Sequence, residues 1–531
     1  MTILPLNAVT EAFQSLPVLV AAGLLAVDLG LRIALLGIIP HNRKPSSAMA
    51  WLLLVLLIPF VGFAIFLVLG RTKIGRRRHA KQAEVNDLIR QRTSTAMVAP
   101  YAAGPSYVES VVTLNRNLGA LPASQGNEVM LHSDYHESIE AMTAAVNGAE
   151  HFVHAQFYIT AWDAVTGPFF DALMRATERG VTVRLLVDYL GSKGIPGYKD
   201  MLARLDTTQI AWRAMLPIGL RRGELRRPDL RNHRKILVVD GEVAFMGSQN
   251  LIEPGYDKEK NHQVGREWVE LTCRVTGPAV AALDAVFATD WYSETDDLLT
   301  DEVVPPRTSS LGGLTAQVIP SGPGFATENN LRAFTTLLYS ARRRISITSP
   351  YFVPDESLLY AVTTAAHRGV EVELFVSEEG DQFMVYHAQC SYYGALLEAG
   401  VRIYLYPAPY VLHSKHFSID EDVAVLGSSN MDLRSFGLNY EVSMMLGGGD
   451  VVSRMRKVED AYRARSRELS AEEWARRPDG TFHGPFANVW CGLPNRAFGG
   501  HDEYGGHGGP EPPHRAVGAA GARGGSGGPA P

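Results

Sequence analysis

Cysteine is scarce in this chain, and charge of neither sign dominates it. The three cysteines, Cys273, Cys390 and Cys491, lie far apart and form no Cys-x-x-Cys pair. Their number and spacing exclude a disulfide framework and a zinc site, so a reducing compartment is expected. The 50 Lys and Arg residues nearly balance 56 Asp and Glu residues, which gives a net charge of -6. This balance argues against a general nucleic-acid binder, because such proteins are usually basic.

Apolar residues, by contrast, are plentiful, and two long apolar runs stand near the N-terminus. Hydrophobic residues make up 46% of the 531 residues, which predicts more than one domain. Residues 50–69 contain no charge, and residues 17–39 contain only Asp28 and Arg32, which are close enough along a helix to pair. About 20 apolar residues can cross a hydrocarbon core. We therefore expect a membrane anchor over 1–80 with two transmembrane helices, at about 17–39 and 50–69.

Basic residues around these runs predict the orientation of the anchor. The connection between the runs is short, so the helices form a hairpin, and Pro59 can kink the second of them. That connection carries only Arg43 and Lys44, whereas six basic residues follow between 71 and 81. This bias predicts a multi-pass protein of the cell membrane with its catalytic part on the cytoplasmic side and the basic cluster against anionic lipid headgroups. A secretory signal peptide is disfavoured, because no Lys or Arg precedes Arg32.

The rest of the chain alternates strand-like apolar runs with amphipathic helices. Residues 152–159 and 181–188 are typical of buried strands, and residues 169–180 between them of a helix closed by glycine. The order strand, helix, strand predicts an α/β layer with parallel strands. The same order returns over residues 344–377, where His-Arg-Gly ends the helix as Glu-Arg-Gly ends the first. Two similar halves are therefore expected.

Composition marks the boundaries of these halves. The stretch 301–316 is rich in Pro, Ser and Gly, which predicts the join between a linker with the first half (81–305) and a second half (306–475). Between 496 and 531, 12 of 36 residues are Gly and 5 are Pro. Such a segment cannot bury enough surface to offset the entropy of ordering, so we expect a disordered tail over 476–531.

Each half carries one copy of the same motif. The pattern is His-x-Lys-x-x-x-x-Asp followed by Gly-Ser-x-Asn, and each position of the second copy lies 180 residues after its counterpart. One copy of so short a motif is a weak signal, but two copies with matching offsets are a strong one. The candidate site residues are His233, Lys235, Asp240, Ser248 and Asn250 in the first half, and His413, Lys415, Asp420, Ser428 and Asn430 in the second.

These side chains suit a phosphodiester substrate. Residues i and i+2 of a strand share a face, so each His projects together with its Lys. One imidazole can attack phosphorus to form a phospho-histidine, while the other protonates the leaving alcohol and deprotonates the incoming one. The lysines neutralise phosphate oxygens, and the Gly-Ser-x-Asn turns add hydroxyl, amide and backbone donors. No metal and no other cofactor is expected, because this chemistry needs none and no carboxylate cluster is present to hold one.

The acidic residues of the site are harder to assign. Asp240 precedes a glycine between two apolar runs, as in a hairpin turn, so a turn role competes with a catalytic one. A carboxylate is also expected to orient each histidine. Glu441 lies 28 residues past His413, and at the corresponding place in the first half Glu270 is preferred to Glu267. An ordinary surface position is an equally good interpretation for Glu270.

Basic side chains gather just before the first motif. Seven of the fifteen residues from 221 to 235 are basic. Because the run ends at His233 itself, we interpret it as a means of gathering an anionic lipid toward the site rather than as a solvated loop.

The paired motifs resemble those of the phospholipase D superfamily. Within it, the chain from about 17 to 475 resembles the bacterial cardiolipin synthases, through the stretches PSSAMAWLLLVLLIPFVGFAIFLVLGR, RGVTVRLLVDYLGS, SPYFVPD and GSSNMDLRSFGLNYE. The resemblance implies two α/β/α halves that form one pseudo-twofold catalytic unit. It also implies condensation of two phosphatidylglycerol molecules to cardiolipin and glycerol, with His233 as nucleophile, His413 as acid and base, and Glu441 orienting a histidine.

The chain departs from that family at two places, and other activities compete. A Gly-rich end follows EEWARRP (472–478), and His416 stands beside Lys415, where small residues are usual. A phospholipase D-type hydrolase, or a transferase that uses a different alcohol, would need the same motifs, because pocket shape and water exclusion select the acceptor. A nuclease is disfavoured by the apolar helices and the net charge of -6. A catalytically inactive membrane scaffold is disfavoured because both histidines and both lysines are present.

Overall fold

The computed structural model describes residues 18–41, 43–70, 75–93, 105–218, 227–299, 312–325 and 328–476. The predicted disordered tail lies outside the described residues from 477 onward. The join between the halves and the first part of the basic run before His233 also lie outside them.

The described N-terminal part consists of apolar helices followed by two polar ones. The helices are α2 (Val18–Ile38), α3 (Pro45–Leu57), α4 (Pro59–Leu69), α5 (Arg76–Arg92) and α6 (Ser106–Gly119). The predicted pairing of Asp28 with Arg32 is confirmed, with 2.7 Å between Arg32 Nε and Asp28 Oδ2. Among the helices in the described ranges, none combines the length and the apolar character needed to cross a membrane.

The prediction of one helix over 50–69 is wrong, because the chain breaks at Ile58. This residue has φ -131° and ψ 73°, since a proline disfavours helical backbone in the residue before it and lacks an N–H. Helix α4 then packs so closely on α3 that a Cβ on Gly62 would lie 2.6 Å from Leu54 O. The two helices have 13 and 11 residues. They are therefore only about 20 and 17 Å long, against about 30 Å of hydrocarbon.

Two halves of similar construction follow. The first consists of β1 (Ser124–His132), α7 (Tyr135–Asn147), β2 (Phe152–Phe157), α8 (Gly167–Glu178), β3 (Thr182–Asp188), α9 (Tyr189–Lys193), α10 (Tyr198–Leu205), β4 (Ala211–Met215), β5 (Arg231–Asn232), β6 (Ile236–Val239), β7 (Val243–Gly247), α11 (Glu259–Val264), β8 (Trp268–Val269), β9 (Thr272–Thr276) and α12 (Ala279–Thr295). The second consists of β10 (Leu314–Ser321), α13 (Asn329–Ser340), β11 (Arg344–Thr348), β12 (Phe352–Val353), α14 (Glu356–His367), β13 (Glu371–Ser377), α15 (Phe383–Cys390), α16 (Tyr393–Glu398), β14 (Arg402–Tyr406), β15 (Val411–Leu412), β16 (His416–Ile419), β17 (Val423–Gly427), β18 (Met431–Asp432), α17 (Leu433–Gly437), β19 (Asn439–Gly447), α18 (Val451–Arg465), β20 (Arg467–Leu469) and α19 (Ala471–Ala475). The predicted strand–helix–strand order is confirmed in both halves, and the strands it joins, β2 with β3 and β11 with β13, are parallel.

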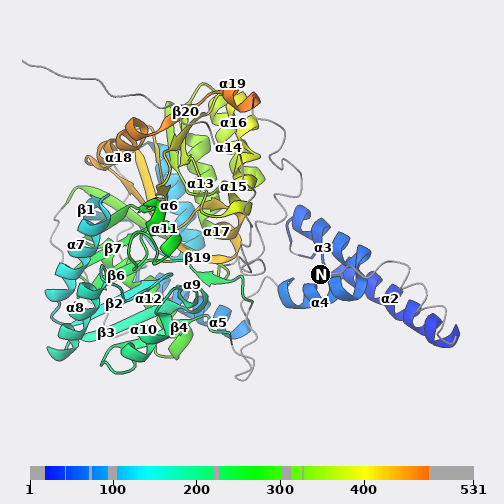
Figure 1. The fold of residues 1–531 in the computed structure, drawn as a ribbon, viewed down its shortest axis with the longest axis horizontal. Coiled ribbons are helices and arrows are strands. Elements are labelled where there is room, and N and C mark those ends of the chain that lie inside the picture. The colour runs from blue at the N-terminus through cyan, green and yellow to red at the C-terminus, as the bar shows by residue number, and fades with distance from the viewer. Residues whose placement is uncertain are drawn as a thin grey trace, which may run out of the picture. The chain divides into compact units, whose positions relative to one another are not determined.

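Within the described residues, one mixed sheet of 16 strands carries both halves, which lie side by side in Figure 1. Outward from the centre, the first half has the order β1-β9-β7-β6-β2-β3-β4 and the second has β10-β19-β17-β16-β11-β13-β14-β20. The two orders correspond strand for strand as far as β4 and β14. The central strands β1 and β10 are antiparallel, as an approximate twofold axis between the halves requires. The halves are therefore repeats of one α/β unit.

Helix α6 precedes the first half in the chain but packs on the second. Its Val111 and Val112 belong to the buried cluster that also contains Leu337 of α13. Asn115 of the same helix donates from Nδ2 to Gln317 Oε1 of β10 at 3.1 Å. The segment between α5 and β1 therefore reaches across the central strands, so the two halves do not separate cleanly at the join that the sequence predicts.

Part of the basic cluster on α5 faces α12 instead of solvent. Arg78 Nη2 lies 2.5 Å from Glu294 Oε1, and Lys81 Nζ lies 2.5 Å from Asp296 Oδ1. Arg78 and Lys81 are mostly buried by this contact. For these two side chains, acidic partners on the same chain replace the predicted lipid headgroups.

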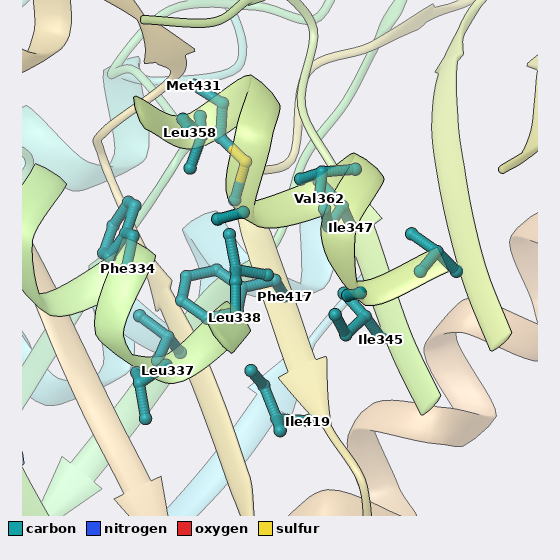
Figure 2. Close-up of a cluster of buried hydrophobic side chains, with 14 of the residues drawn as sticks. Phe334, Leu337, Leu338, Ile345, Ile347, Leu358, Val362, Phe417, Ile419 and Met431 are labelled. Atoms are coloured by element: carbon teal, nitrogen blue, oxygen red, sulfur yellow. The ribbon is translucent and has the colours of Figure 1, made fainter. Parts of the chain in front are cut away.

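Apolar side chains of helices and strands interlock in the second half, as Figure 2 shows. Phe334 and Leu337 of α13 meet Phe417 and Ile419 of β16, and all four belong to one buried cluster. The rings of Phe334 and Phe417 are 4.8 Å apart, edge to face. This layer fixes the position of β16, the strand that follows Lys415 of the second motif.

Replacing Phe417 by Ala should lower the free energy of unfolding by about 3–5 kcal/mol, because it opens a cavity under the motif strand. Phe417 is 1% exposed, whereas Tyr360, a suitable control on α14, is 56% exposed. Tyr360→Ala should change the free energy by about 0.5 kcal/mol or less. Denaturant unfolding of the detergent-solubilised protein measures both. Equal losses for the two variants would contradict this packing.

Candidate active site

Each motif histidine follows a two-residue strand that pairs with the opposite half. Strand β5 of the first half runs parallel to β19 of the second, and β15 of the second runs parallel to β8 of the first. One more main-chain bond extends each pair. His233 N donates to Tyr440 O at 2.9 Å, and His413 N donates to Val269 O at 2.8 Å. Both histidines therefore lie at the seam between the halves.

The glutamate beside each histidine comes from the opposite half. His233 Nδ1 lies 3.0 Å from Glu441 Oε2, and His413 Nδ1 lies 2.7 Å from Glu270 Oε1. Both glutamates are buried, at 0% exposed for Glu441 and 2% for Glu270. Each immediately precedes the residue whose carbonyl oxygen accepts from the motif serine of its own half. Glu270 and Glu441 thus occupy equivalent positions of the repeat.

This exchange differs from the sequence-based expectation, which located each glutamate by counting from the histidine of its own half. The preferred Glu270 is at the site, whereas Glu267 is exposed and contributes its carbonyl oxygen to Val411 N at 2.9 Å. The offset from Glu270 to Glu441 is 171 residues, not the 180 of the motif. Extra residues in the first half, including helix α11, account for the difference.

The surroundings of His233 determine which ring nitrogen carries its proton. Nδ1 lies 3.0 Å from both Glu441 Oε2 and Ser428 O. A carbonyl oxygen only accepts hydrogen bonds, so Nδ1 is the donor and Nε2 of the neutral ring keeps its lone pair. Burial, together with the charges of Lys235 and Lys415, holds the pKa of His233 well below its ordinary value. Burial likewise lowers the pKa of His413.

The two lysines accompany the histidines along each strand. Lys235 Nζ donates to His233 O at 2.6 Å, and Lys415 Nζ donates to His413 O at 2.5 Å. Burial lowers the pKa of Lys235 to about 7 and that of Lys415 to about 8. Their charge therefore varies with pH near neutrality, and a bound phosphate would favour the protonated forms.

The motif serines hold the strands that carry the glutamates. Ser428 Oγ donates to Glu441 Oε2 and accepts from Val442 N at 3.0 Å. Ser248 Oγ accepts in the same way from the N–H that follows the first-half glutamate, also at 3.0 Å. The glycine before each serine permits this approach, since a Cβ on Gly427 would lie 2.3 Å from Val442 O. The serines are therefore positioned to orient the carboxylates.

The two motif asparagines are used differently. Asn250 Oδ1 accepts from Ile159 N at 3.1 Å, and its Nδ2 donates to Tyr256 OH at 2.8 Å. That hydroxyl in turn lies 3.4 Å from Glu270 Oε1. Asn430 is also buried, but its Oδ1 has no hydrogen-bond partner among the described residues. Asn250 thus supports the first-half glutamate, whereas Asn430 keeps an acceptor for a ligand.

Asp240 and Asp420 are not brought to the histidines. They end the motif strands, with φ 53° and 47°, and each carboxylate accepts from three successive main-chain N–H groups at 2.8–3.0 Å. These are the N–H groups of 150–152 for Asp240 and of 342–344 for Asp420. Five residues of strand separate each aspartate from its lysine, or about 16 Å. The turn interpretation accounts for both.

His416, which the sequence places beside Lys415, faces away from the site. Neighbouring residues of a strand point to opposite faces, and His416 Nε2 lies 3.2 Å from Thr348 Oγ1 and 4.0 Å from Glu459 Oε1. Burial, with a smaller effect of the Arg456 charge, lowers the pKa of His416 to about 3. The ring is therefore neutral and adds no charge next to Lys415.

The two histidine–glutamate pairs differ in charge. Burial raises the pKa of Glu441 to about 7. Burial acts in the same direction on Glu270, but His413 and Lys415 reverse it and lower the pKa of that carboxyl. The described ranges contain no group of three or more His, Cys, Asp or Glu side chains that could hold a metal ion.

Sequence reasoning missed Tyr158 and Asp188, which stand close to the first histidine. The ring of Tyr158 lies 4.8 Å from that of His233, and Lys235 Nζ lies 5.3 Å from its centre. Asp188 Oδ2 accepts from Asn232 N at 2.9 Å and so anchors the strand before the histidine. Both residues stand at the carboxyl ends of parallel strands, where α/β proteins bind ligands. That position was the available signal.

Comparisons with known proteins agree with this geometry. The family model "Cardiolipin synthase, PLD-like domain" matches residues 142–291 and 334–461, and "Phospholipase_D-nuclease N-terminal" matches residues 31–71. Cardiolipin synthase A of Proteus mirabilis (strain HI4320) is 32% identical over 83% of this chain and 91% of the relative. Cardiolipin synthase A of Serratia proteamaculans (strain 568) is 34% identical over 83% and 92%. The chain therefore belongs to the cardiolipin synthase family of PLD-like proteins.

A solved structure shares the fold of the two halves. The crystal structure of phosphatidylserine synthase from Haemophilus influenzae Rd KW20 aligns with a TM-score of 0.52 at 15% sequence identity. The alignment covers 70% of this chain and 93% of that protein. At this identity the likeness concerns the fold alone.

Replacing Asp240 by Ala should reduce stability but not turnover. The variant removes the acceptor of three main-chain N–H groups, which should lower the free energy of unfolding by about 1–3 kcal/mol. Its kcat per folded molecule should stay within about twofold of the wild type, because the carboxylate is remote from the histidines. Asp420→Ala should behave alike. Loss of kcat at full folded fraction would return the aspartates to the reacting groups.

Activity should fall as the pH rises through the pKa values of the two lysines. Deprotonation of Lys235 and Lys415 removes the charge that phosphate oxygens require, so kcat/KM, which reports the free enzyme, should decline above about pH 7. Lys235→Arg keeps its proton to a pKa above about 12. This variant should remove one proton from the decline, even at a lower absolute rate. An unchanged profile in Lys235→Arg and Lys415→Arg would assign the decline to other groups.

Proposed function

We propose that this chain is a cardiolipin synthase, which transfers a phosphatidyl group from one phosphatidylglycerol to another and releases glycerol. The observation that carries the proposal is the pair of buried histidines, each with a glutamate of the opposite half on Nδ1 and a lysine two residues on. Membership of the cardiolipin synthase family supports a phospholipid as the phosphodiester.

The first half-reaction transfers the phosphatidyl group to the enzyme. His233 Nε2 attacks the phosphorus of one phosphatidylglycerol, and the bond from phosphorus to the headgroup oxygen breaks. His413 protonates that oxygen, and glycerol leaves. The negative charge of the bound lipid raises the pKa of His413, and the ionised Glu270 on Nδ1 stabilises its imidazolium form. The protonated lysines neutralise the charge that develops on the phosphate oxygens.

The second half-reaction reverses these roles. A hydroxyl of the headgroup of the second phosphatidylglycerol attacks the phosphorus, and His413 takes its proton. The bond between phosphorus and His233 Nε2 breaks, which releases cardiolipin and restores both histidines. The difference between the glutamates supports this assignment. Ionised Glu270 favours a protonated His413, whereas the raised pKa of Glu441 favours a neutral, nucleophilic His233.

The same proposal places the enzyme at the cell membrane. Helices α2–α4 expose large apolar side chains, among them Leu25 (65%), Ile33 (61%) and Leu57 (78%), and a lipid phase would cover them. We propose that these helices hold the enzyme in the membrane, with the catalytic halves on the cytoplasmic side. The side assignment rests on the excess of Lys and Arg after residue 70 over that in the loop before residue 45.

The purified protein, supplied with vesicles of labelled phosphatidylglycerol, should form cardiolipin and free glycerol in equal amounts. A two-lipid condensation fixes this ratio, because each transfer releases one headgroup. Separation of the lipids and assay of glycerol measure it. Phosphatidic acid as the sole lipid product would make water the acceptor and overturn the proposal in favour of a phospholipase D-type hydrolase.

Replacing either His233 or His413 by Ala should abolish turnover, because both rings serve one reaction. His136→Ala, which removes an exposed histidine on α7, is the matched control and should keep full activity. The labelled-lipid assay measures all three variants. Near-full activity in either site variant would contradict a single shared site.

A further inference from the structure

The residue between the histidine and the lysine differs between the two motifs. In the first half it is Arg234, whose side chain is 1% exposed, and in the second it is Ser414. Burying a guanidinium is costly unless its donors are satisfied and its charge is balanced. This cost is accepted on one side of the site only, which indicates a task that the second half-site does not share.

The guanidinium of Arg234 donates to three separate elements. Nη1 donates to Asp290 Oδ2 of α12 at 2.7 Å, and Nη2 donates to Ser321 O at the end of β10 at 3.1 Å. Nε donates to Glu441 O of β19 at 3.0 Å. Ser321 and Glu441 face each other across the β10–β19 pair. Arg234 and Asp290 belong to the first half and the other two to the second, so the side chain clamps the seam.

The first-half end of this clamp is fixed. Asp290 also accepts from Gln156 Nε2 of β2 at 2.7 Å, and both residues are fully buried. The guanidinium carbon of Arg234 lies 5.3 Å from the centre of the Tyr440 ring, next to Glu441 in the chain. The position of Glu441 is thus referred to the core of the half that carries His233.

We propose that Arg234 is a positioning residue, which holds the main chain of Glu441 so that its carboxylate meets His233 Nδ1. The inference rests on the proposed function, in which His233 reacts with the phosphodiester. Ser428 and Asn439 hold the carboxylate end of Glu441, and Arg234 holds its backbone end. At the second half-site, Ser414 provides only a main-chain bond, from its N to Val269 O at 3.0 Å.

A double-mutant cycle tests this role through cardiolipin formation from phosphatidylglycerol. Arg234→Met should lower kcat about 100-fold, because a misplacement of about 1 Å has such an effect. KM should stay within about threefold, because Arg234 contacts Glu441 and not the lipid. Glu441→Gln should also lower kcat. Adding Arg234→Met to Glu441→Gln should then cost no more than about a further twofold, since coupled residues are not additive.

Glu270→Gln provides the matched control for this cycle. Its carboxylate serves His413, so its loss should multiply with that of Arg234→Met. If Arg234→Met is equally damaging in the wild type and in Glu441→Gln, the clamp is overturned. Full activity of Glu441→Gln alone is a different result, which overturns the role of Glu441 in the proposed function.

Two further variants separate positioning from folding. Arg234→Lys keeps the charge beside Asp290 but cannot reach three acceptors, so its kcat should be about tenfold above that of Arg234→Met. It also replaces Arg234→Met in the cycle if that variant does not fold. Arg456→Met removes a buried arginine that contacts Glu459 and Asp420 O. It should lower stability but not kcat per folded molecule. A kcat loss in Arg234→Lys that only follows the folded fraction would reject the proposal.

Discussion

The exchange of two short strands across the seam is the interaction on which the site depends. Each histidine stands at the end of a segment that pairs with the opposite half, beside the glutamate which that half provides. Neither half therefore contains a complete histidine–glutamate pair. The antiparallel contact of β1 with β10 sets the halves in the arrangement that makes both exchanges possible at once. The sheet thus acts as one frame for the chemistry.

Burial gives this frame its chemical properties. Two lysines, two histidines and two glutamates are all nearly inaccessible to water, so each charged form is stable only if its neighbours are suitably charged. A phosphodiester brings the negative charge that the lysines lack in the empty site. Substrate binding and protonation are therefore linked. The serines and Asn250, which hold main chain and carboxylates, keep the polar groups satisfied without adding charge.

Much of this arrangement could be predicted from the sequence. The repeat, its strands and helices and the His–Lys pairs follow from periodicity and from a constant offset of 180 residues. The offset failed beyond Asn250, because helix α11 is present in the first half only, and the opposite-half pairing of Glu270 and Glu441 leaves no local signal. Local spacing also could not separate Asp240 as a turn residue from a reacting group. The break at Ile58 shows how Pro59 outweighs a uniformly apolar run.

The symmetry of the sheet contrasts with what fills the two half-sites. Tyr158 and Arg234 surround His233, while a proline and a serine occupy the corresponding places around His413 (Pro350 and Ser414). The shared frame delivers two similar imidazoles to one phosphorus atom, and the unshared side chains allow them to do different work. Duplication alone would give two interchangeable histidines. The differences between the copies are what let one chain distinguish the lipid that gives up its headgroup from the lipid that receives the phosphatidyl group.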